Sequence, residues 1–177
     1  MNIIIVGCGK VGRTLAEQLS NEKHNIVIVD IIEKKIQDTT EDIDIMGFLG
    51  NAASINTLLD AGIETADLLI AVTGSDELNL LCCLIAKRVS KCHTIARVRN
   101  PVYSKELGFI KQSLGISLIF NPEYEGESFM NLGDKCELKK DALGNCLSTT
   151  KITICGVAVF LPGGAEQLAY MLDSDCY

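Results

Sequence analysis

Short runs of β-branched and other apolar residues alternate with amphipathic stretches through the first 120 residues of the chain. This rhythm is typical of parallel strands joined by crossover helices. Six runs are predicted to be strands: residues 2–6, 25–30, 43–46, 68–72, 94–98 and 117–120. Because crossovers between parallel strands are almost always right-handed, these units predict an α/β fold, a doubly wound, Rossmann-like parallel sheet with helices on both faces.

The stretches between these runs place apolar residues at helical spacing. Val11, Leu15 and Leu19 are spaced i, i+4 and i+8, and they predict a helix that packs on the sheet. A second helical face is predicted from five residues: Leu78, Leu81, Cys82, Ile85 and Val89. A third helix is expected to begin at Pro101, whose fixed φ suits a first turn, and to end before Gly115. Its apolar face comprises Tyr103, Leu107, Ile110 and Leu114.

The rhythm changes after residue 120. Residues 123–145 are charged and contain three glycines, which indicates irregular or weakly helical structure. Residues 151–161 are strand-like, and a Pro-Gly-Gly turn at 162–164 precedes an apolar stretch at 165–172. We therefore expect a nucleotide-binding domain over residues 1–125 and an atypical C-terminal extension, with a short helix and strand, over residues 126–177.

The first predicted strand leads directly into the motif G-x-G-x-x-G, formed by Gly7, Cys8, Gly9, Lys10, Val11 and Gly12. In this context the first glycine permits a tight turn, the second lets the backbone approach a pyrophosphate, and the third lets helix and strand pack closely. The N-terminus of the helix offers unpaired N–H groups and a partial positive charge to the anion. The motif therefore predicts a dinucleotide site.

Asp30 ends the second predicted strand, 18 residues after Gly12, where a carboxylate accepts hydrogen bonds from a ribose diol. The same carboxylate would repel a 2′-phosphate, which favours NAD or an adenine nucleotide over NADP. The competing interpretation makes the glycines ordinary turn residues and Asp30 a solvated strand end or helix N-cap. Lys10 and Arg13 flank the loop, each either as a phosphate contact or as an exposed base.

Two other strand ends carry small or polar residues that are expected to line the same crevice. Asn51 and Ala52 follow the third strand, and Thr73 and Gly74 follow the fourth. Turns and N-caps use the same residue types, and Ser75 or Asp76 would equally cap the helix that starts near Glu77. Arg97 lies among apolar neighbours in the fifth strand, and we expect it to meet an anion rather than to extend into solvent.

Composition excludes several classes of function. The chain has 23 acidic and 16 basic residues, a net charge of −7 that disfavours nucleic-acid binding. The longest wholly apolar run, residues 80–86, is far shorter than the roughly 18–20 residues that span a bilayer, and no secretory leader is evident at the start. We therefore expect a cytoplasmic protein without direct membrane insertion. Eight cysteines without a C-x-x-C pair, together with only two histidines, argue against a zinc site.

The assembled residues resemble the nucleotide-binding domain of the KTN/RCK type that regulates potassium channels and transporters, in particular the TrkA family of Trk-type potassium uptake regulatory subunits. The likeness spans roughly residues 1–125. It is carried by the stretches IIIVGCGKVGRTLAEQLS, LGNAASINTLLDAGIETADLLIAVTGSDELNLL, IARVRNPVYS and LGISLIFNPEYE. These stretches are far more specific than the glycine motif alone.

The resemblance implies that residues 7–11 hold a diphosphate and that Asp30 holds the adenosine ribose. The pocket would be completed by Thr73, Gly74 and Arg97, with Asn51 and Ala52 beside them. The implied ligand is NAD or NADH, with ATP or ADP as alternatives. The implied protein is a cytoplasmic subunit, peripheral at the inner face of the plasma membrane, that docks as a homodimer or higher ring on a membrane-embedded potassium transporter or channel subunit and catalyses no reaction.

The sequence departs from the family pattern in two places. Asn51 stands where the family often has an acid or a histidine. The long apolar crossover helix that the family uses for dimerisation is interrupted here by Gly126, Gly133 and the lysine-rich residues 135–140, and the family's second small domain is absent or truncated.

Two other functions compete with regulation. An NAD-dependent oxidoreductase would use the same fold, but only about 57 residues follow the sheet, without a histidine or a Tyr-x-x-x-Lys pair. A redox sensor would use Cys8, since a helix N-terminus lowers a thiol pKa. We rank the regulatory module first and expect no enzymatic activity.

Overall fold

The computed structural model describes residues 1–120, 149–154, 157–162 and 169–172 of the 177-residue chain. The chain forms two compact units, Met1–Ser128 and Phe129–Tyr177. The predicted boundary at residues 125 and 126 falls outside the described residues and stays a prediction.

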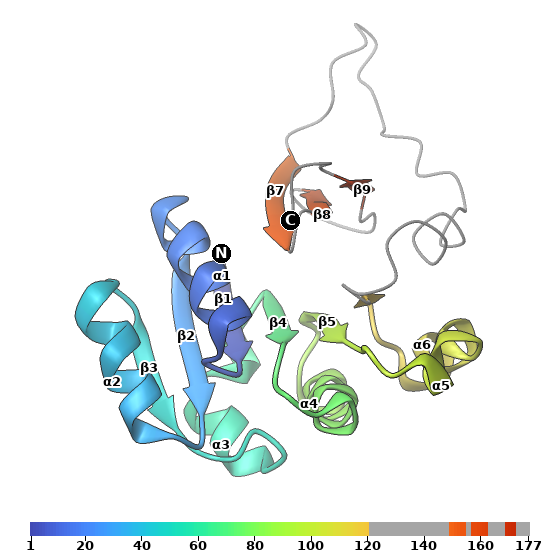
Figure 1. Cartoon of the computed structure of the whole chain (residues 1–177), viewed down its shortest axis with the longest axis horizontal. Helices are drawn as coiled ribbons and strands as arrows, with labels where there is room; N and C mark the ends of the chain where they lie inside the picture. The colour runs from blue at the N-terminus through green and yellow to red at the C-terminus, as the bar shows by residue number, and fades with distance from the viewer. Residues whose placement is uncertain (121–148, 155–156, 163–168, 173–177) are drawn as a thin grey trace, which may run out of the picture. The chain divides into compact units, whose positions relative to one another are not determined.

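A six-stranded parallel sheet organises the first unit (Figure 1). Its strands, in chain order, are β1 (Asn2–Val6), β2 (Asn25–Asp30), β3 (Met46–Leu49), β4 (Leu68–Ala71), β5 (His93–Arg97) and β6 (Leu118–Phe120). They lie side by side in the order β3-β2-β1-β4-β5-β6. The doubly wound α/β fold is thereby confirmed. The chain changes direction between β1 and β4, where such sheets open a crevice at the carboxyl ends of their strands.

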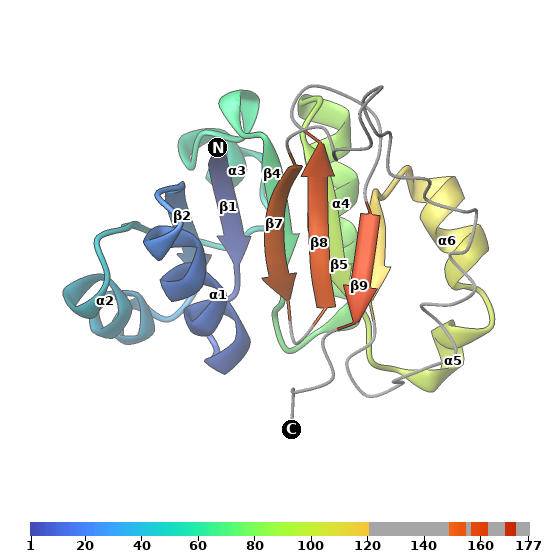
Figure 2. The ribbon, with the colours of Figure 1, turned by 90° about the horizontal axis from the view of Figure 1, so that it is seen from above.

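Helices connect consecutive strands, and α1 and α4 lie on opposite faces of the sheet (Figures 1 and 2). They are α1 (Lys10–Asn21), α2 (Glu33–Asp42), α3 (Ile55–Asp60), the 3₁₀ turn η1 (Ile63–Thr65), α4 (Asp76–Val89), α5 (Pro101–Ser104) and α6 (Leu107–Leu114). The central strands are covered on both sides, so β1 and β4 are buried almost throughout and need continuous apolar runs. Leu15 and Leu19 are buried, which confirms the predicted face of α1.

The third strand lies three residues later than predicted, at Met46–Leu49 instead of residues 43–46. The preceding helix, α2, continues to Asp42, and the Ile43 N–H donates to the Thr39 carbonyl as its last turn closes. β3 pairs with β2 from Val27↔Met46 to Asp30↔Leu49. Within the sheet this strand is at the edge, where backbone pairing with one neighbour suffices and a strongly apolar sequence is unnecessary.

The predicted face of α4 is confirmed except at Leu81: Cys82 is buried, and Leu78, Ile85 and Val89 pack, partly buried, against the core. Leu81 is 42% exposed, whereas Asp76, Asn79, Cys83 and Ala86 are buried. The prediction ranked positions by hydrophobicity and therefore missed the two polar residues on this face, which are buried because they bond to neighbouring backbone.

The single helix expected after Pro101 is divided into α5 and α6. Its apolar positions Tyr103, Leu107, Ile110 and Leu114 still pack, partly buried, against the core. Gly115 ends α6 with φ +67°, as expected for a C-terminal glycine.

The second unit contains a three-stranded antiparallel sheet in the order β7-β8-β9. Its strands are β7 (Thr149–Ile154), β8 (Val157–Pro162) and β9 (Ala169–Leu172). The single strand predicted over residues 151–161 is wrong, because β7 and β8 pair with each other from Thr149↔Pro162 to Ile154↔Val157. The irregular or helical structure expected for residues 123–145 lies outside the described residues.

No helix in the described parts of the chain combines the length and apolar character that a membrane crossing requires. Within those same parts, no group of three or more His, Cys, Asp or Glu side chains is arranged to hold a metal ion.

Candidate functional site

A cleft of about 540 Å³ opens in the first unit at the carboxyl ends of the strands. All predicted site residues except Cys8 and Gly12 line it: Gly7, Gly9, Lys10, Val11, Asp30, Asn51, Ala52, Thr73, Gly74 and Arg97. These residues come from the ends of five different strands and the turns that follow them. The fold therefore brings together positions that span 90 residues of sequence.

Residues 7–12, called the glycine loop below, turn sharply from β1 into α1. Gly7 has φ +104°, and its N–H donates to the Val29 carbonyl at 2.8 Å. A Cβ at Gly12 would lie 1.8 Å from the Gly7 carbonyl oxygen, so only glycine permits this close approach of α1 to the loop. A Cβ at Gly9 would meet no atom within 4 Å, and Gly9 lines the cleft. Space at Gly9 is therefore available to a bound group.

Asp30 joins the glycine loop to the end of β2. Its Oδ2 accepts a hydrogen bond from the Cys8 N–H at 2.7 Å, and its Oδ1 accepts one from the Ile32 N–H at 2.9 Å. The N-cap of α2 is Ile32, so the alternative role of Asp30 as helix cap is wrong. Each carboxylate oxygen can accept a further hydrogen bond, and Asp30 lines the cleft. Its position suits recognition of hydroxyl groups.

Asn79, which was not among the predicted site residues, supports the opposite wall of the cleft. Its Oδ1 accepts hydrogen bonds from the Thr73 N–H at 2.8 Å and from the Thr73 hydroxyl at 2.7 Å. Its Nδ2 donates to the Arg97 carbonyl at 2.8 Å. The side chain is fully buried and links the ends of β4 and β5. The sequence signal that could have identified Asn79 is an amide side chain among the apolar residues of α4.

Two arginines hold the turn after β4. Arg97 lines the cleft and donates from Nη2 to the Thr73 carbonyl at 2.7 Å, while Arg99 donates from Nη2 to the Gly74 carbonyl at 3.0 Å. The predicted contact of Arg97 with an anion stays a prediction. Ser75 is the N-cap of α4, and its Oγ accepts from the Leu78 N–H at 3.2 Å, which confirms the simpler interpretation of that residue.

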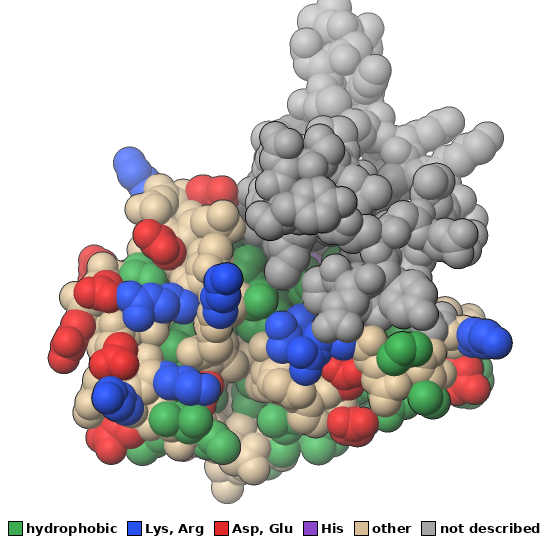
Figure 3. Space-filling model, in the orientation of Figure 1, with side chains coloured by type: hydrophobic (Ala, Val, Ile, Leu, Met, Phe, Trp, Pro, Cys, Tyr) green, Lys and Arg blue, Asp and Glu red, His purple; other side chains and the backbone are tan. Residues whose placement is uncertain are grey.

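The lining of the cleft is positively charged although the chain carries a net charge of −7. Its ionisable side chains are Lys10, Lys35 and Arg97 against the single carboxylate of Asp30. Figure 3 shows acidic and basic side chains interspersed over the face that it draws. Lys35, from α2, was not predicted, because an exposed lysine in a polar helix has no distinguishing pattern. This excess of positive charge suits an anionic ligand.

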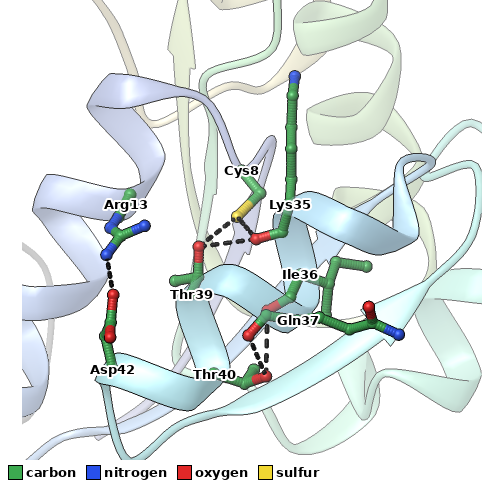
Figure 4. A network of polar contacts seen from close by, with 8 residues as sticks. All are labelled: Cys8, Arg13, Lys35, Ile36, Gln37, Thr39, Thr40 and Asp42. Carbon is green, nitrogen blue, oxygen red and sulfur yellow. Dashed lines mark hydrogen bonds and ion pairs between the residues drawn. The ribbon is translucent and has the colours of Figure 1, made fainter.

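Arg13, the other predicted candidate for a phosphate contact, forms an ion pair with Asp42 at the end of α2 (Figure 4). It does not line the cleft. Arg13 is therefore a surface base, as the alternative interpretation had it, whereas Lys10 faces the cleft.

Cys8 does not line the cleft. Its side chain points toward Lys35 and Thr39 of α2 (Figure 4). Its Sγ lies 3.0 Å from the Thr39 hydroxyl and donates to the Lys35 carbonyl at 3.2 Å. The residue is 5% exposed, and burial raises the pKa of its thiol. A redox sensor needs a thiol with a lowered pKa, so the redox-sensor hypothesis is wrong for Cys8 in this respect.

The residues that form this cleft match a family of known proteins. The family model described as TrkA-N domain matches residues 3–122, which include every residue that lines the cleft. The chain belongs to the TrkA-N domain family. The match covers the six-stranded sheet apart from Asn2, the first residue of β1.

Relatives of this TrkA-N domain chain are named as potassium uptake proteins. A Trk system potassium uptake protein TrkA homolog from Archaeoglobus fulgidus is 38% identical over 123 residues, which are 70% of this chain and 28% of that protein. The chain spans between 27% and 58% of the length of the first curated relatives it matches.

Solved structures share the fold of the TrkA-N domain chain. The TrkA-N domain of the inner membrane protein YbaL from Escherichia coli superposes with a TM-score of 0.63 at 23% identity, covering 75% of this chain and 96% of that one. The GsuK channel bound to NAD superposes with a TM-score of 0.59 at 20% identity, covering 90% of this chain and 27% of that one. The same channel has also been solved bound to ADP.

Proposed function

We propose that this chain is a nucleotide-binding regulatory subunit of a Trk-type potassium uptake system. Its ligand is NAD or NADH, with ATP or ADP as the alternative. The observation that carries the proposal is the cleft itself, where the glycine loop, the Asp30 carboxylate and three cationic side chains face one space. Membership in the TrkA-N family and the names of the relatives support the potassium uptake system as its setting.

The pyrophosphate binds at the glycine loop. The start of α1 presents backbone N–H groups there, and the Arg13 N–H already donates to the Gly9 carbonyl as the first turn closes. The open space at Gly9 lets the phosphates approach the backbone, and Lys10 supplies a countercharge. The geometry of the loop thus matches a diphosphate, the group that NAD, ADP and ATP have in common.

The adenosine ribose binds at Asp30, whose oxygens each accept one backbone N–H and keep capacity for a ribose hydroxyl. A 2′-phosphate would place negative charge beside that carboxylate, so NADP binds less tightly than NAD. Asn51, Ala52, Thr73, Gly74 and Arg97 complete the binding site from the neighbouring strand ends.

The nucleotide acts as an effector and no reaction is catalysed. The curated relatives are named as potassium uptake proteins, which supports regulation over oxidoreductase activity. An effector shifts the population of two domain geometries only by its difference in affinity between them. The subunit works in the cytoplasm at the inner face of the plasma membrane, as a homodimer or higher ring bound to a membrane-embedded potassium transporter or channel subunit.

The experiment is a thermal-shift series with NAD, NADH, NADP, ATP and ADP, followed by calorimetric titration of each ligand that binds. A ligand that binds only the folded state raises Tm, by an amount that grows with its concentration over Kd. We expect a rise with NAD, NADH or the adenine nucleotides and a smaller one with NADP. A Tm that no nucleotide changes, or one that only NADP raises, would overturn the proposal.

A further inference from the structure

The glycine loop is connected to α2 by a contact between two side chains that do not line the cleft, Cys8 and Thr39 (Figure 4). The Thr39 hydroxyl donates to the Lys35 carbonyl at 2.8 Å, so its oxygen is left to accept from the Cys8 thiol, whose Sγ lies 3.0 Å away. The thiol proton is shared with the same Lys35 carbonyl, 3.2 Å from Sγ. Cys8 and Thr39 are buried, at 5% and 1% exposure. Cys8 of the glycine loop is thereby held against α2, the helix that follows β2.

The helix does not need this contact for its own hydrogen bonding. Thr39 already satisfies its hydroxyl by donating to the Lys35 carbonyl, four residues earlier in α2. The next residue, Thr40, makes the same kind of bond to the Ile36 carbonyl at 3.0 Å but has no bond to the glycine loop. The two threonines therefore share a bond within α2 and differ in the link from Thr39 to Cys8; they also differ in burial, since Thr39 is buried and Thr40 is half-buried.

Both ends of the link lead to groups that line the cleft. The backbone N–H of Cys8 donates to the Asp30 Oδ2 at 2.7 Å, and the Cys8 carbonyl belongs to the same peptide unit as the Gly9 N–H. The Lys35 carbonyl belongs to the residue whose side chain enters the lining. Rotation of the Cys8 side chain would thus disturb the loop amides, Asp30 and the start of α2 together.

We infer that Cys8 and Thr39 are positioning residues for the nucleotide site, which their contact preorganises before ligand binds. This inference rests on the proposed function. A loop that is already fixed loses less conformational freedom on binding, so the link increases affinity although neither side chain touches the ligand. The buried thiol acts here by packing and hydrogen bonding, in accord with its raised pKa.

The test compares Thr39→Val with Thr40→Val. Each variant removes one hydroxyl that bonds within α2, and the Tm of each records the structural penalty, which burial makes larger for Thr39. Only Thr39→Val removes the oxygen that contacts the Cys8 thiol. Calorimetric titration with NAD, at a temperature well below the Tm of every variant, measures affinity separately from stability. We expect Thr39→Val to raise Kd by about threefold to tenfold, the scale of one hydrogen bond, and Thr40→Val to change it less than about twofold. Thr39→Ser, which keeps the hydroxyl, restores the affinity.

Cys8 variants test the other end. Cys8→Ala is expected to weaken NAD binding at least as much as Thr39→Val, because it removes the contact with Thr39 and the bond to the Lys35 carbonyl. The double variant is expected to be no weaker than Cys8→Ala, since the contact with Thr39 is already lost there. Cys8→Ser recovers part of the affinity through its hydroxyl. If either single variant unfolds, the remaining one with its serine rescue still decides the matter.

The outcomes separate the two proposals. If the wild type binds none of the nucleotides, the proposed function fails and the positioning role fails with it. If the wild type binds NAD and Thr39→Val binds it as tightly as Thr40→Val, the positioning role is wrong while the proposed function stands. Equal weakening in the two valine variants would likewise assign the effect to the helix rather than to the link.

Discussion

Two residues of the glycine loop, Gly9 and Gly12, are expected to respond to alanine substitution in opposite ways. A Cβ at Gly12 would lie 1.8 Å from the Gly7 carbonyl oxygen and 3.0 Å from its carbonyl carbon, both of them backbone atoms. A Cβ at Gly9 would meet nothing within 4 Å, and its φ of −80° is accessible to any residue. Gly12→Ala should therefore damage the fold, and Gly9→Ala should damage the site.

The magnitudes follow from these contacts. Overpacking costs about 1–3 kcal/mol, and Gly12→Ala belongs at the upper end because the atoms it meets cannot rotate away. A loss of about 3 kcal/mol lowers the Tm of a domain of this size by roughly 10 °C. Gly9→Ala loses about 0.5 kcal/mol as an N-cap and recovers a similar amount from the less flexible unfolded chain, so its Tm stays near that of the wild type.

The assay combines thermal unfolding of the unliganded proteins with calorimetric titration of NAD. Gly9→Ala is expected to weaken NAD binding about tenfold or more, since its methyl group occupies the place of the pyrophosphate. Gly108→Ala in α6 is the control, because its Cβ meets no atom within 4 Å and it lies outside the cleft lining. It should stabilise the fold by up to about 1 kcal/mol and leave NAD affinity unchanged.

Two results would refute this reasoning. A Gly9→Ala protein that binds NAD as tightly as the wild type would show that the nucleotide does not approach the loop backbone. A Gly12→Ala protein with the wild-type Tm would show that the close packing of α1 on the loop is unimportant for stability.

Three further predictions concern other parts of the chain. Asp30→Ala should weaken NAD binding by about 1–3 kcal/mol in calorimetric titrations, and unchanged affinity would contradict its role at the ribose. Asn79→Ala should lower the free energy of unfolding by about 2–4 kcal/mol in urea, since it leaves the Thr73 N–H and the Arg97 carbonyl without their buried partner. Burial raises the pKa of the Cys82 thiol from 9.0 to about 12, so the folded state favours the neutral thiol. The free energy of unfolding should therefore keep its full value below pH 9 and fall as the pH rises toward 12. Urea melts at several pH values would detect this fall. A free energy of unfolding that does not change over that pH range would contradict the burial of the thiol.

The sequence by itself determined the fold and most of the lining of the cleft. The runs at β1 and β4 are continuously apolar because both faces of a central parallel strand are covered, and that requirement is visible in the residues themselves. The glycine loop and Asp30 were predictable for a related reason. Each lies at the end of a strand, and the carboxyl ends of parallel strands meet at one edge of the sheet whatever the details of packing.

Only the tertiary structure decided which polar side chains support that edge. Asn79 is buried because it bonds to Thr73 and Arg97, which lie six residues before it and 18 residues after it in sequence. The direction of Cys8, toward Thr39 rather than into the cleft, depends on how α2 packs beside the loop. Hydrophobic periodicity reports which face of an element is covered, but a hydrogen bond between distant residues depends on the positions of both partners, and these exist only in the folded chain.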